Sequence, residues 1–223
     1  MISEILPINL NAKTPNLRVD ELKNIIINSK PNSLILAPEL AFSHYDKNFD
    51  DDKVQCEIQE ILEDRILIYT RYYYFCGILL NAIFAINKFG AFHIRGKSKH
   101  FLPAQEDKLF QTQDEAKNIK FNINGIICGS LICFELRFVE LWARLKDCDI
   151  IFVPAMWGEI RKDHFFSLCK ALAIVNTCFV VFCSGGENGI LQTSGVFLPD
   201  GNKRNFYKFD PNFIDKVKRG LGL

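Results

Sequence analysis

Short apolar runs alternate with amphipathic segments along this chain, and this alternation restricts its fold more than any other feature. Runs rich in Ile, Leu, Val and Phe, as expected of strands buried on both faces, lie at 33–38, 148–155 and 178–184. Apolar residues at helical spacing predict helices at 16–28, 52–63, 137–146 and 163–177. The pattern therefore predicts an α/β fold built from packed layers.

Hairpin signals interrupt the alternation. Two strand-like segments at 65–75 and 76–86 follow one another directly, and "NING" at 122–125 is typical of a tight β-turn. Strands joined by hairpins are antiparallel, so we expect mixed β-sheets rather than purely parallel ones. No linker, low-complexity segment or fixed repeat divides the sequence, which favours a single domain over 1–223.

Composition excludes several classes of function. The formal net charge is +1, which gives no reason to expect nucleic acid or an anionic membrane as a partner. The N-terminal residues lack the pattern of a signal peptide, and no apolar run has the length of a membrane span. We therefore expect a cytoplasmic protein. None of the eight cysteines forms a C-x-x-C pair, so we expect reduced, mostly buried thiols and no metal site.

Reactive residue types stand where the predicted strands end. One strand leads to Glu39, another to Cys133, and the polar loop between them carries Lys99. Strand ends in layered α/β folds meet at a common edge, where sites are usually built. A thiol, a carboxylate and an ammonium at that edge would supply a nucleophile, a general base and a group that stabilises an oxyanion.

These segments resemble the nitrilase superfamily, the carbon–nitrogen hydrolases. The segments "LAPEL", "KHFLP" and "ICFELRF" are similar in sequence and in order to its three signature segments. "LLNAIFAINKFG", "IFVPAMW" and "SGVFLPDG" extend the resemblance over most of the chain. The resemblance implies a four-layer αββα sandwich, a catalytic Glu–Lys–Cys triad and a homodimer, and it requires no cofactor.

Carried over to this sequence, the triad would be Glu39, Lys99 and Cys133. Lys97 competes with Lys99 for the middle position. The family pattern has a Leu three residues after its lysine, and Leu102 stands in that relation to Lys99. We therefore assign Lys99. The resemblance also implies that Glu106 is an accessory carboxylate near the substrate.

The residues around Cys133 suggest further roles. The backbone N–H of Phe134 can face an oxyanion, while Glu135 and Arg137 can hold the loop by ion pairing. Arg137 could also contact the substrate, as could Trp157 at the end of another predicted strand. A neighbouring cation would lower the pKa of Cys133 and make it the most reactive of the eight thiols.

The predicted activity is hydrolysis of a small linear amide, as in an ω-amidase, through a thioester acyl-enzyme. N-carbamoyl amide hydrolysis and nitrile hydrolysis remain alternatives because the triad is common to all three. A catalytically weak binding protein that keeps the fold is an alternative of another class. Phe101 and Gly158 depart from the His and Pro of the family pattern, and these departures bear on the substrate more than on the chemistry.

The predicted helix at 137–146 carries an apolar stripe. Phe138, Leu141, Trp142 and Leu145 follow helical spacing, and the stripe is wide enough to need a partner surface. Trp is favoured as an interface anchor. We therefore predict a homodimer in which Trp142 takes part.

Overall fold

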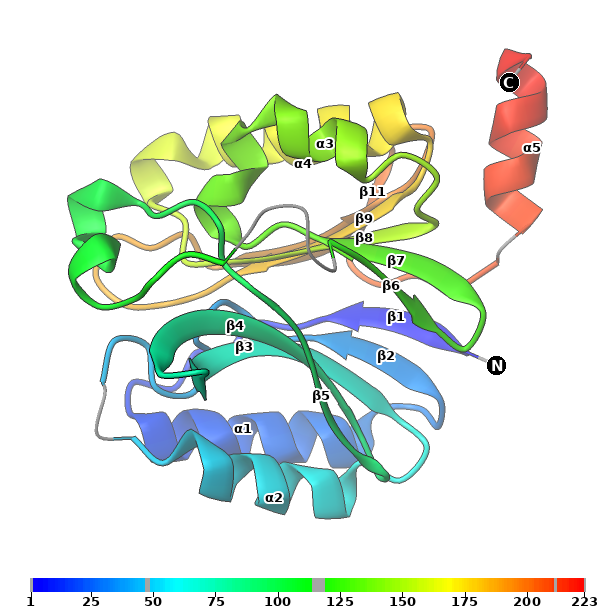
Figure 1. The fold of residues 1–223 in the computed structure, drawn as a ribbon. Coiled ribbons are helices and arrows are strands. Elements are labelled where there is room, and N and C mark those ends of the chain that lie inside the picture. The colour runs from blue at the N-terminus through cyan, green and yellow to red at the C-terminus, as the bar shows by residue number, and fades with distance from the viewer. Residues whose placement is uncertain (1, 47–48, 114–118, 211, 223) are drawn as a thin grey trace.

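The computed structural model describes residues 2–46, 49–113, 119–210 and 212–222. Two β-sheets lie face to face between two layers of helices (Figure 1). This arrangement confirms the predicted α/β sandwich with four layers. Among the described residues, no helix combines the length and the apolar character needed to cross a lipid bilayer.

The first sheet contains five strands in chain order. They are β1 (Glu4–Pro7), β2 (Ser33–Leu36), β3 (Ile66–Phe75), β4 (Ile78–Asn87) and β5 (Gly90–Gly96). β1, β2 and β3 are parallel, whereas β4 is antiparallel to both β3 and β5. β5 therefore runs in the same direction as β2, and the two strands end at the same edge.

The second sheet contains six strands, in the order β11-β10-β9-β8-β7-β6. They are β6 (Lys120–Ile123), β7 (Ile126–Ser130), β8 (Ile150–Ala155), β9 (Phe179–Ser184), β10 (Thr193–Phe197) and β11 (Lys203–Arg204). The central strands β7, β8 and β9 are parallel, and the outer pairings are antiparallel. Both sheets are thus mixed, as the hairpin signals predict.

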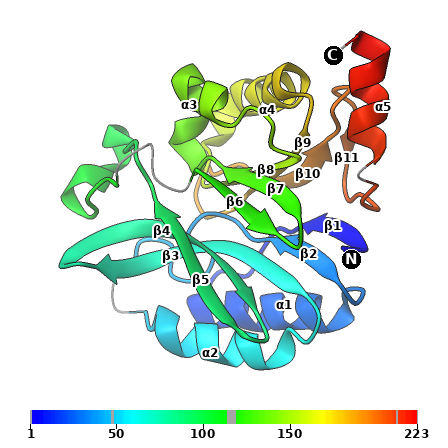
Figure 2. The same ribbon diagram turned by 45° about the vertical axis from the view of Figure 1, so that its right-hand side comes forward.

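Helices cover the outer face of each sheet. α1 (Pro15–Asn28) and α2 (Asp51–Ile61) lie against the first sheet, and α3 (Val139–Arg144) and α4 (Lys162–Asn176) lie against the second (Figures 1 and 2). α5 (Asn212–Leu221) stands beside the sandwich. α3 is shorter than the predicted helix at 137–146, because Arg137 is the last residue of a separate 3₁₀ helix, Cys133–Arg137, and the α-helix begins only at Val139 and ends at Arg144.

The alternation of side chains along a strand explains how the first sheet contributes to two hydrophobic cores. Leu34 and Leu36 of β2 face the second sheet, whereas Ile35 between them packs beneath α1 with Leu22 and Ile26. Successive side chains of a strand point to opposite faces, so a continuous apolar run fills both interiors. The inner core fixes how the two sheets face each other, and it thereby positions the loops at their ends.

Candidate active site

A buried lysine between two carboxylates lies at the edge where β2 and β5 end. Lys97 follows the last residue of β5, and its Nζ lies 2.8 Å from Oε1 of Glu39 and 2.8 Å from Oε1 of Glu106. All three residues are 1% exposed. Burial alone would lower the pKa of Lys97, but the carboxylates of Glu39 and Glu106 raise it overall, so the ammonium stays charged.

The structure places Lys97 beside Glu39, and not Lys99 as the sequence predicts. Nζ of Lys99 lies 4.0 Å from Oε1 of Glu140 and 4.9 Å from the centre of the Phe138 ring, on the side of α3. Lys97 takes its place because it still belongs to the sheet: its N–H donates to the carbonyl of Asn81 on β4. The β5 pleat thus directs the Lys97 side chain into the interior, while the chain has left the sheet before Lys99.

Cys133 meets this group from the second sheet. It is the first residue of the 3₁₀ helix after β7, it is 7% exposed, and its thiol lies near enough to the carboxylate of Glu39 for that charge to raise its pKa. Its φ is 49°, in the left-handed region that residues with a side chain rarely adopt. Strained backbone of this kind is concentrated at functional sites. The structure thus brings Glu39 and Cys133 together as predicted.

The electrostatics of the Cys133 thiol differ from the expectation. Burial, the largest effect, and the charge of Glu39 raise its pKa well above the ordinary value, and Lys97 only partly offsets them. The pKa shift is thus opposite to the predicted lowering, because burial disfavours the thiolate and the charge of Lys97 is offset by those of Glu39 and Glu106. The resting thiol therefore keeps its proton and needs a base to become a nucleophile.

Two residues that sequence analysis did not assign complete the group. Asn81 is fully buried, and its Nδ2 donates to Oε1 of Glu39 at 2.8 Å. The Tyr45 hydroxyl donates to Oε1 of Glu106 at 3.1 Å. The segment "LLNAIFAINKFG" held a signal for Asn81, because a polar residue inside an otherwise apolar strand needs a buried partner. Tyr45 lies in the loop after β2 and carries no comparable signal.

Glu135 clamps the lysine and cysteine loops together. It is fully buried and accepts from the Ser98 N–H at 2.6 Å, next to Lys97, and from the Ile132 N–H at 2.6 Å, next to Cys133. The Arg95 guanidinium pairs with both carboxylate oxygens. The predicted structural role of Glu135 is therefore confirmed, although its partner is Arg95 on β5 and not Arg137.

A narrow pocket opens above Cys133. Its volume is about 260 Å³, its open mouth included, and it is lined by Phe101, Cys133, Phe134, Arg137, Met156, Trp157, Gly158 and Arg161. The structure thus places the predicted substrate-binding residues Phe134, Arg137 and Trp157 around the thiol. Glu106 lies beneath them, paired with Lys97. The Phe134 N–H belongs to the first turn of its 3₁₀ helix. N–H groups in the first turn of a helix have no carbonyl acceptor within that helix.

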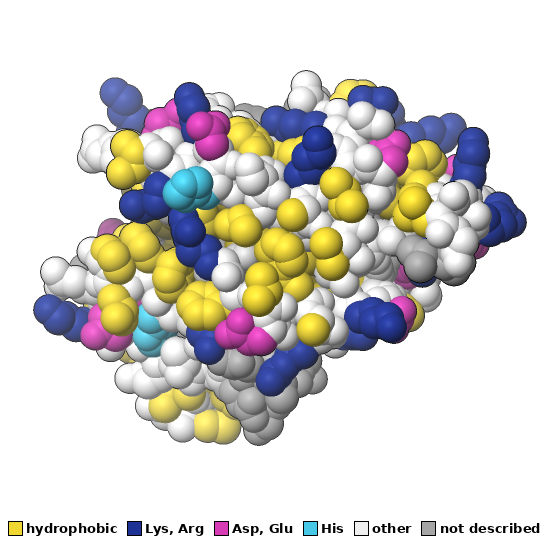
Figure 3. Space-filling view, turned by 90° about the horizontal axis from the view of Figure 1, so that it is seen from above, with side chains coloured by type: hydrophobic (Ala, Val, Ile, Leu, Met, Phe, Trp, Pro, Cys, Tyr) yellow, Lys and Arg dark blue, Asp and Glu magenta, His cyan; other side chains and the backbone are white. Residues whose placement is uncertain are grey.

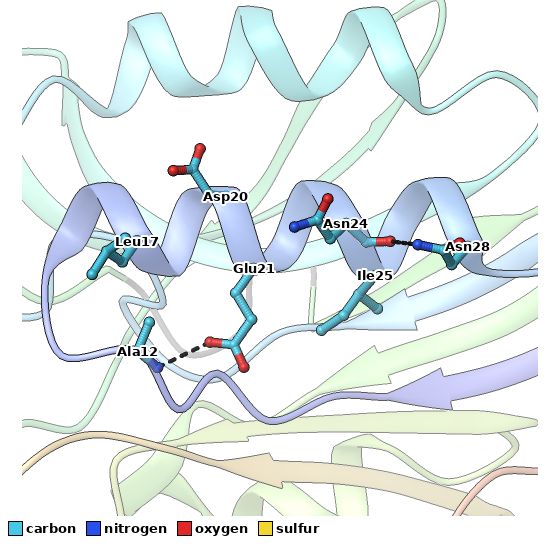
Figure 4. A pocket seen from close by; sticks show the side chains of 7 residues that line it. All are labelled: Ala12, Leu17, Asp20, Glu21, Asn24, Ile25 and Asn28. Atoms are coloured by element: carbon cyan, nitrogen blue, oxygen red, sulfur yellow. Dashed lines mark hydrogen bonds between the residues drawn. The ribbon is translucent and has the colours of Figure 1, made fainter.

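A wider hollow on α1 lacks comparable chemistry (Figure 4). Its central carboxylate, Glu21, accepts from the backbone N–H groups of Asn11 and Ala12 at 2.8 and 2.9 Å, so it fixes the loop before α1. Neither a thiol nor a cation lines this surface. The pocket above Cys133 is therefore the candidate active site.

Comparisons with known proteins agree with this geometry. A family model described as carbon-nitrogen hydrolase matches residues 28–197. The chain is 32% identical over 121 residues to the "Hydrolase in agr operon" of Staphylococcus lugdunensis, covering 52% of each protein. It is 32% identical over 115 residues to the 2-oxoglutaramate amidase of Bacillus subtilis, covering 43% of this chain and 44% of the amidase. The matches thus span about half the length of these curated relatives.

A solved structure has the same fold. The protein XC1258 from Xanthomonas campestris, described as a member of the CN-hydrolase superfamily, superimposes with a TM-score of 0.81 at 13% identity. The superposition covers 100% of this chain and 96% of that one. The likeness extends over the full sandwich, both sheets and their helices included.

Proposed function

This chain belongs to the carbon-nitrogen hydrolase family, and from that membership we propose that it hydrolyses a small linear amide through Cys133, Glu39 and Lys97. One observation carries the proposal: the buried ammonium of Lys97 lies between Glu39 and Glu106, next to the thiol of Cys133. These groups supply a nucleophile, a base and a fixed positive charge in a site that excludes most water.

The first half of the reaction forms an acyl-enzyme. Glu39 takes the thiol proton as Sγ of Cys133 attacks the amide carbonyl carbon, so that a C–S bond forms and the carbonyl π electrons move to oxygen. The protonated Glu39 then gives its proton to the amide nitrogen. The C–N bond breaks, ammonia or an amine leaves, and a thioester remains. The raised pKa of Cys133 makes this base necessary.

The second half releases the acid. Glu39 takes a proton from water as the water oxygen attacks the thioester carbonyl, and the C–S bond breaks when the tetrahedral intermediate collapses. The proton on Glu39 returns to the sulfur, which restores the thiol. Water is thus divided between the acid and the amine, and the enzyme is unchanged.

Stabilisation of the oxyanion falls to Lys97 and to the Phe134 N–H. An ammonium held by two carboxylates cannot turn away, so little reorganisation is needed when charge develops on the substrate oxygen. Glu106 and Tyr45 support this arrangement because the Tyr45 hydroxyl binds the same Glu106 oxygen that holds Lys97. Removing one such oxyanion donor typically costs a factor of about 10²–10³ in kcat.

The amide class is supported by the relatives and by the size of the pocket. A curated relative is named for its action on 2-oxoglutaramate, which is a small linear amide. The narrow pocket above Cys133 suits a short acyl chain. N-carbamoyl amides and nitriles would use the same three residues, so a substrate panel must separate them.

Ammonia release tests the proposal. Purified protein is assayed against linear amides, N-carbamoyl amino acids and nitriles, with Cys133→Ala as the control for chemistry at sulfur. We expect release from a linear amide that Cys133→Ala abolishes. If wild type and Cys133→Ala release ammonia equally, or if neither acts on any member of the panel, the proposal is wrong.

Assembly and location are part of the same proposal. We propose a homodimer formed through α3 and α4, because hydrophobic side chains gather on this face (Figure 3) and Val139 and Val175 are 66% and 70% exposed there. Trp142 is not suited to be the anchor. It is 8% exposed, and its Nε1 donates to the carbonyl of Leu136 within its own subunit. All eight cysteines are unpaired, which supports a reducing, cytoplasmic location.

A further inference from the structure

Arg161 reaches the pocket of Cys133 from the loop after β8. Its guanidinium carbon lies 5.3 Å from the centre of the Phe101 ring. Its backbone is fixed on both sides: its N–H donates to the carbonyl of Gly158 at 2.9 Å, and its carbonyl accepts from Nε1 of Trp157 at 2.9 Å. Two hydrogen bonds thus fix the backbone of Arg161, and the Phe101 ring lies beside its charged side chain at the pocket.

Gly158 gives this guanidinium its room. The backbone of Gly158 has φ −65° and ψ 131°, an extended conformation that any residue adopts, so its dihedral angles do not call for glycine. A Cβ at this position would come within 3.0 Å of Nη2 and 3.6 Å of Cζ of Arg161. The guanidinium therefore lies across the bare Cα, where a larger residue would displace it.

Arg161 also lacks a carboxylate partner among the residues that the structure describes. The neighbouring acid, Glu159, pairs with Lys162 at 3.4 Å. A second cation on the pocket wall, Arg137, lies with its guanidinium carbon 5.1 Å from the centre of the Trp157 ring. Its Nη2 lies 3.1 Å from Nδ1 of His164, and within the described ranges it too makes no ion pair. Two guanidinium groups thus face a pocket whose lining contains no acid.

We propose that Arg161 is a specificity residue that binds a carboxylate of the substrate, so that the preferred substrate is a short linear amide with a carboxylate at its other end. A guanidinium offers two parallel N–H donors that match a carboxylate. The aromatic rings beside it keep its partner partly dry, which strengthens the interaction. This inference rests on the proposed amide hydrolysis for its chemistry, but the anion site itself can be tested without turnover.

A matched pair of substrates tests the role of Arg161. Glutaramate and its methyl ester have the same amide and chain but differ in charge, so the ratio of their kcat/KM values isolates recognition of the carboxylate. We expect wild type to favour glutaramate and Arg161→Met to reduce the ratio about 30-fold, the equivalent of one charge-assisted pair. Lys162→Met removes the adjacent exposed cation and should leave the ratio as in wild type.

Two further variants keep the test sharp if Arg161→Met folds poorly. Gly158→Ala should reduce the same ratio to a smaller extent, because its Cβ would lie 3.0 Å from Nη2 of Arg161 and push the guanidinium out of position. Arg161→Lys should restore part of the preference, since it keeps the charge without the paired donors. A ratio near one in wild type, or an equal loss on both substrates in Arg161→Met, would overturn the inference.

Binding without turnover separates this inference from the proposed activity. Calorimetry with Cys133→Ser and glutarate, the dicarboxylate product, should give a Kd that the additional change Arg161→Met weakens by about 30-fold. If glutarate binding depends on Arg161 but the wild-type protein hydrolyses neither substrate, the anion site is supported and amide hydrolysis is contradicted. Binding that is unchanged by Arg161→Met would contradict the anion site, whatever the activity.

Discussion

Nζ of Lys97 lies 2.8 Å from Oε1 of Glu39, and both side chains are 1% exposed although they follow different strands of the first sheet, β5 and β2. The pair is held from below by Glu106 and approached from the second sheet by Cys133. The ammonium can therefore neither leave nor lose its charge without disturbing two carboxylates.

Substitution of Lys97 and substitution of Lys99 should have very different effects on kcat and on stability. Lys97→Ala should reduce kcat by at least about 10²–10³ because an oxyanion donor is lost. It should also lower the free energy of unfolding by about 3–5 kcal/mol, since two buried carboxylates lose their partner. Lys99→Ala should leave both nearly unchanged. Steady-state kinetics and urea denaturation measure the two effects, and an inactive Lys99→Ala beside an active Lys97→Ala would reverse the assignment.

Asn81 should act by positioning Glu39. Asn81→Ala removes the hydrogen bond to Oε1 of Glu39, and we expect kcat to fall by about 100-fold with little change in KM. Asn87→Ala, at the far end of the same strand, is the matched control. Equal kinetics for the two variants would show that Glu39 needs no such support.

Glu135 should make stability depend on pH in the acid range. Burial would raise its pKa, but Arg95 and the N–H groups of Ser98 and Ile132 lower it overall from the ordinary value of 4.5. Because the folded-state pKa is depressed, its stabilisation is complete above pH 4.5 and is lost as pH falls through the folded-state pKa.

The variant Glu135→Gln should reveal this dependence. At pH 7 it should lower the free energy of unfolding by about 3–5 kcal/mol, because Arg95 is left buried without an opposite charge. The difference in the free energy of unfolding between wild type and Glu135→Gln should disappear as the pH falls below the ordinary glutamate range. Urea denaturation at several pH values measures this difference. The control Glu140→Gln, on the exposed side of α3, should have the free energy of unfolding of wild type at every pH.

Alkylation should report the raised pKa of Cys133. Iodoacetamide should label the exposed Cys56 and Cys76 first, and inactivation should follow the slower labelling of Cys133. In a Cys56→Ser/Cys76→Ser protein, the inactivation rate should keep rising through pH 9 without a plateau, because the thiol titrates well above its ordinary value of 9.0. Peptide mapping identifies the sites, and a plateau near neutral pH would indicate a preformed thiolate.

The dimer should depend on exposed residues and not on Trp142. Val175→Glu or Val139→Glu should shift the sedimentation coefficient toward that of one chain while the thermal unfolding of the subunit is preserved. Trp142→Glu should instead destabilise the subunit, because it buries a charge in the core. A wild-type protein that sediments as a single chain at micromolar concentration contradicts the proposed assembly.

Local patterns determined the elements and two of the three central residues. Continuous apolar runs are enough to predict β2 and β7, and a chemically reactive residue at the end of such a run has few structural reasons to be there. Glu39 and Cys133 could therefore be predicted to meet at the sheet edge, because strand ends converge in any layered α/β fold.

Only the tertiary structure decided between Lys97 and Lys99. The two residues lie two positions apart in a polar loop, and their local sequences do not differ in any property that specifies burial. The choice depends on where the chain leaves β5: the Lys97 N–H still pairs with β4, whereas the Ser98 N–H turns to the carboxylate of Glu135 from the second sheet. A contact between two sheets thus sets which ammonium faces Glu39, and the sequence of the loop itself does not contain that contact.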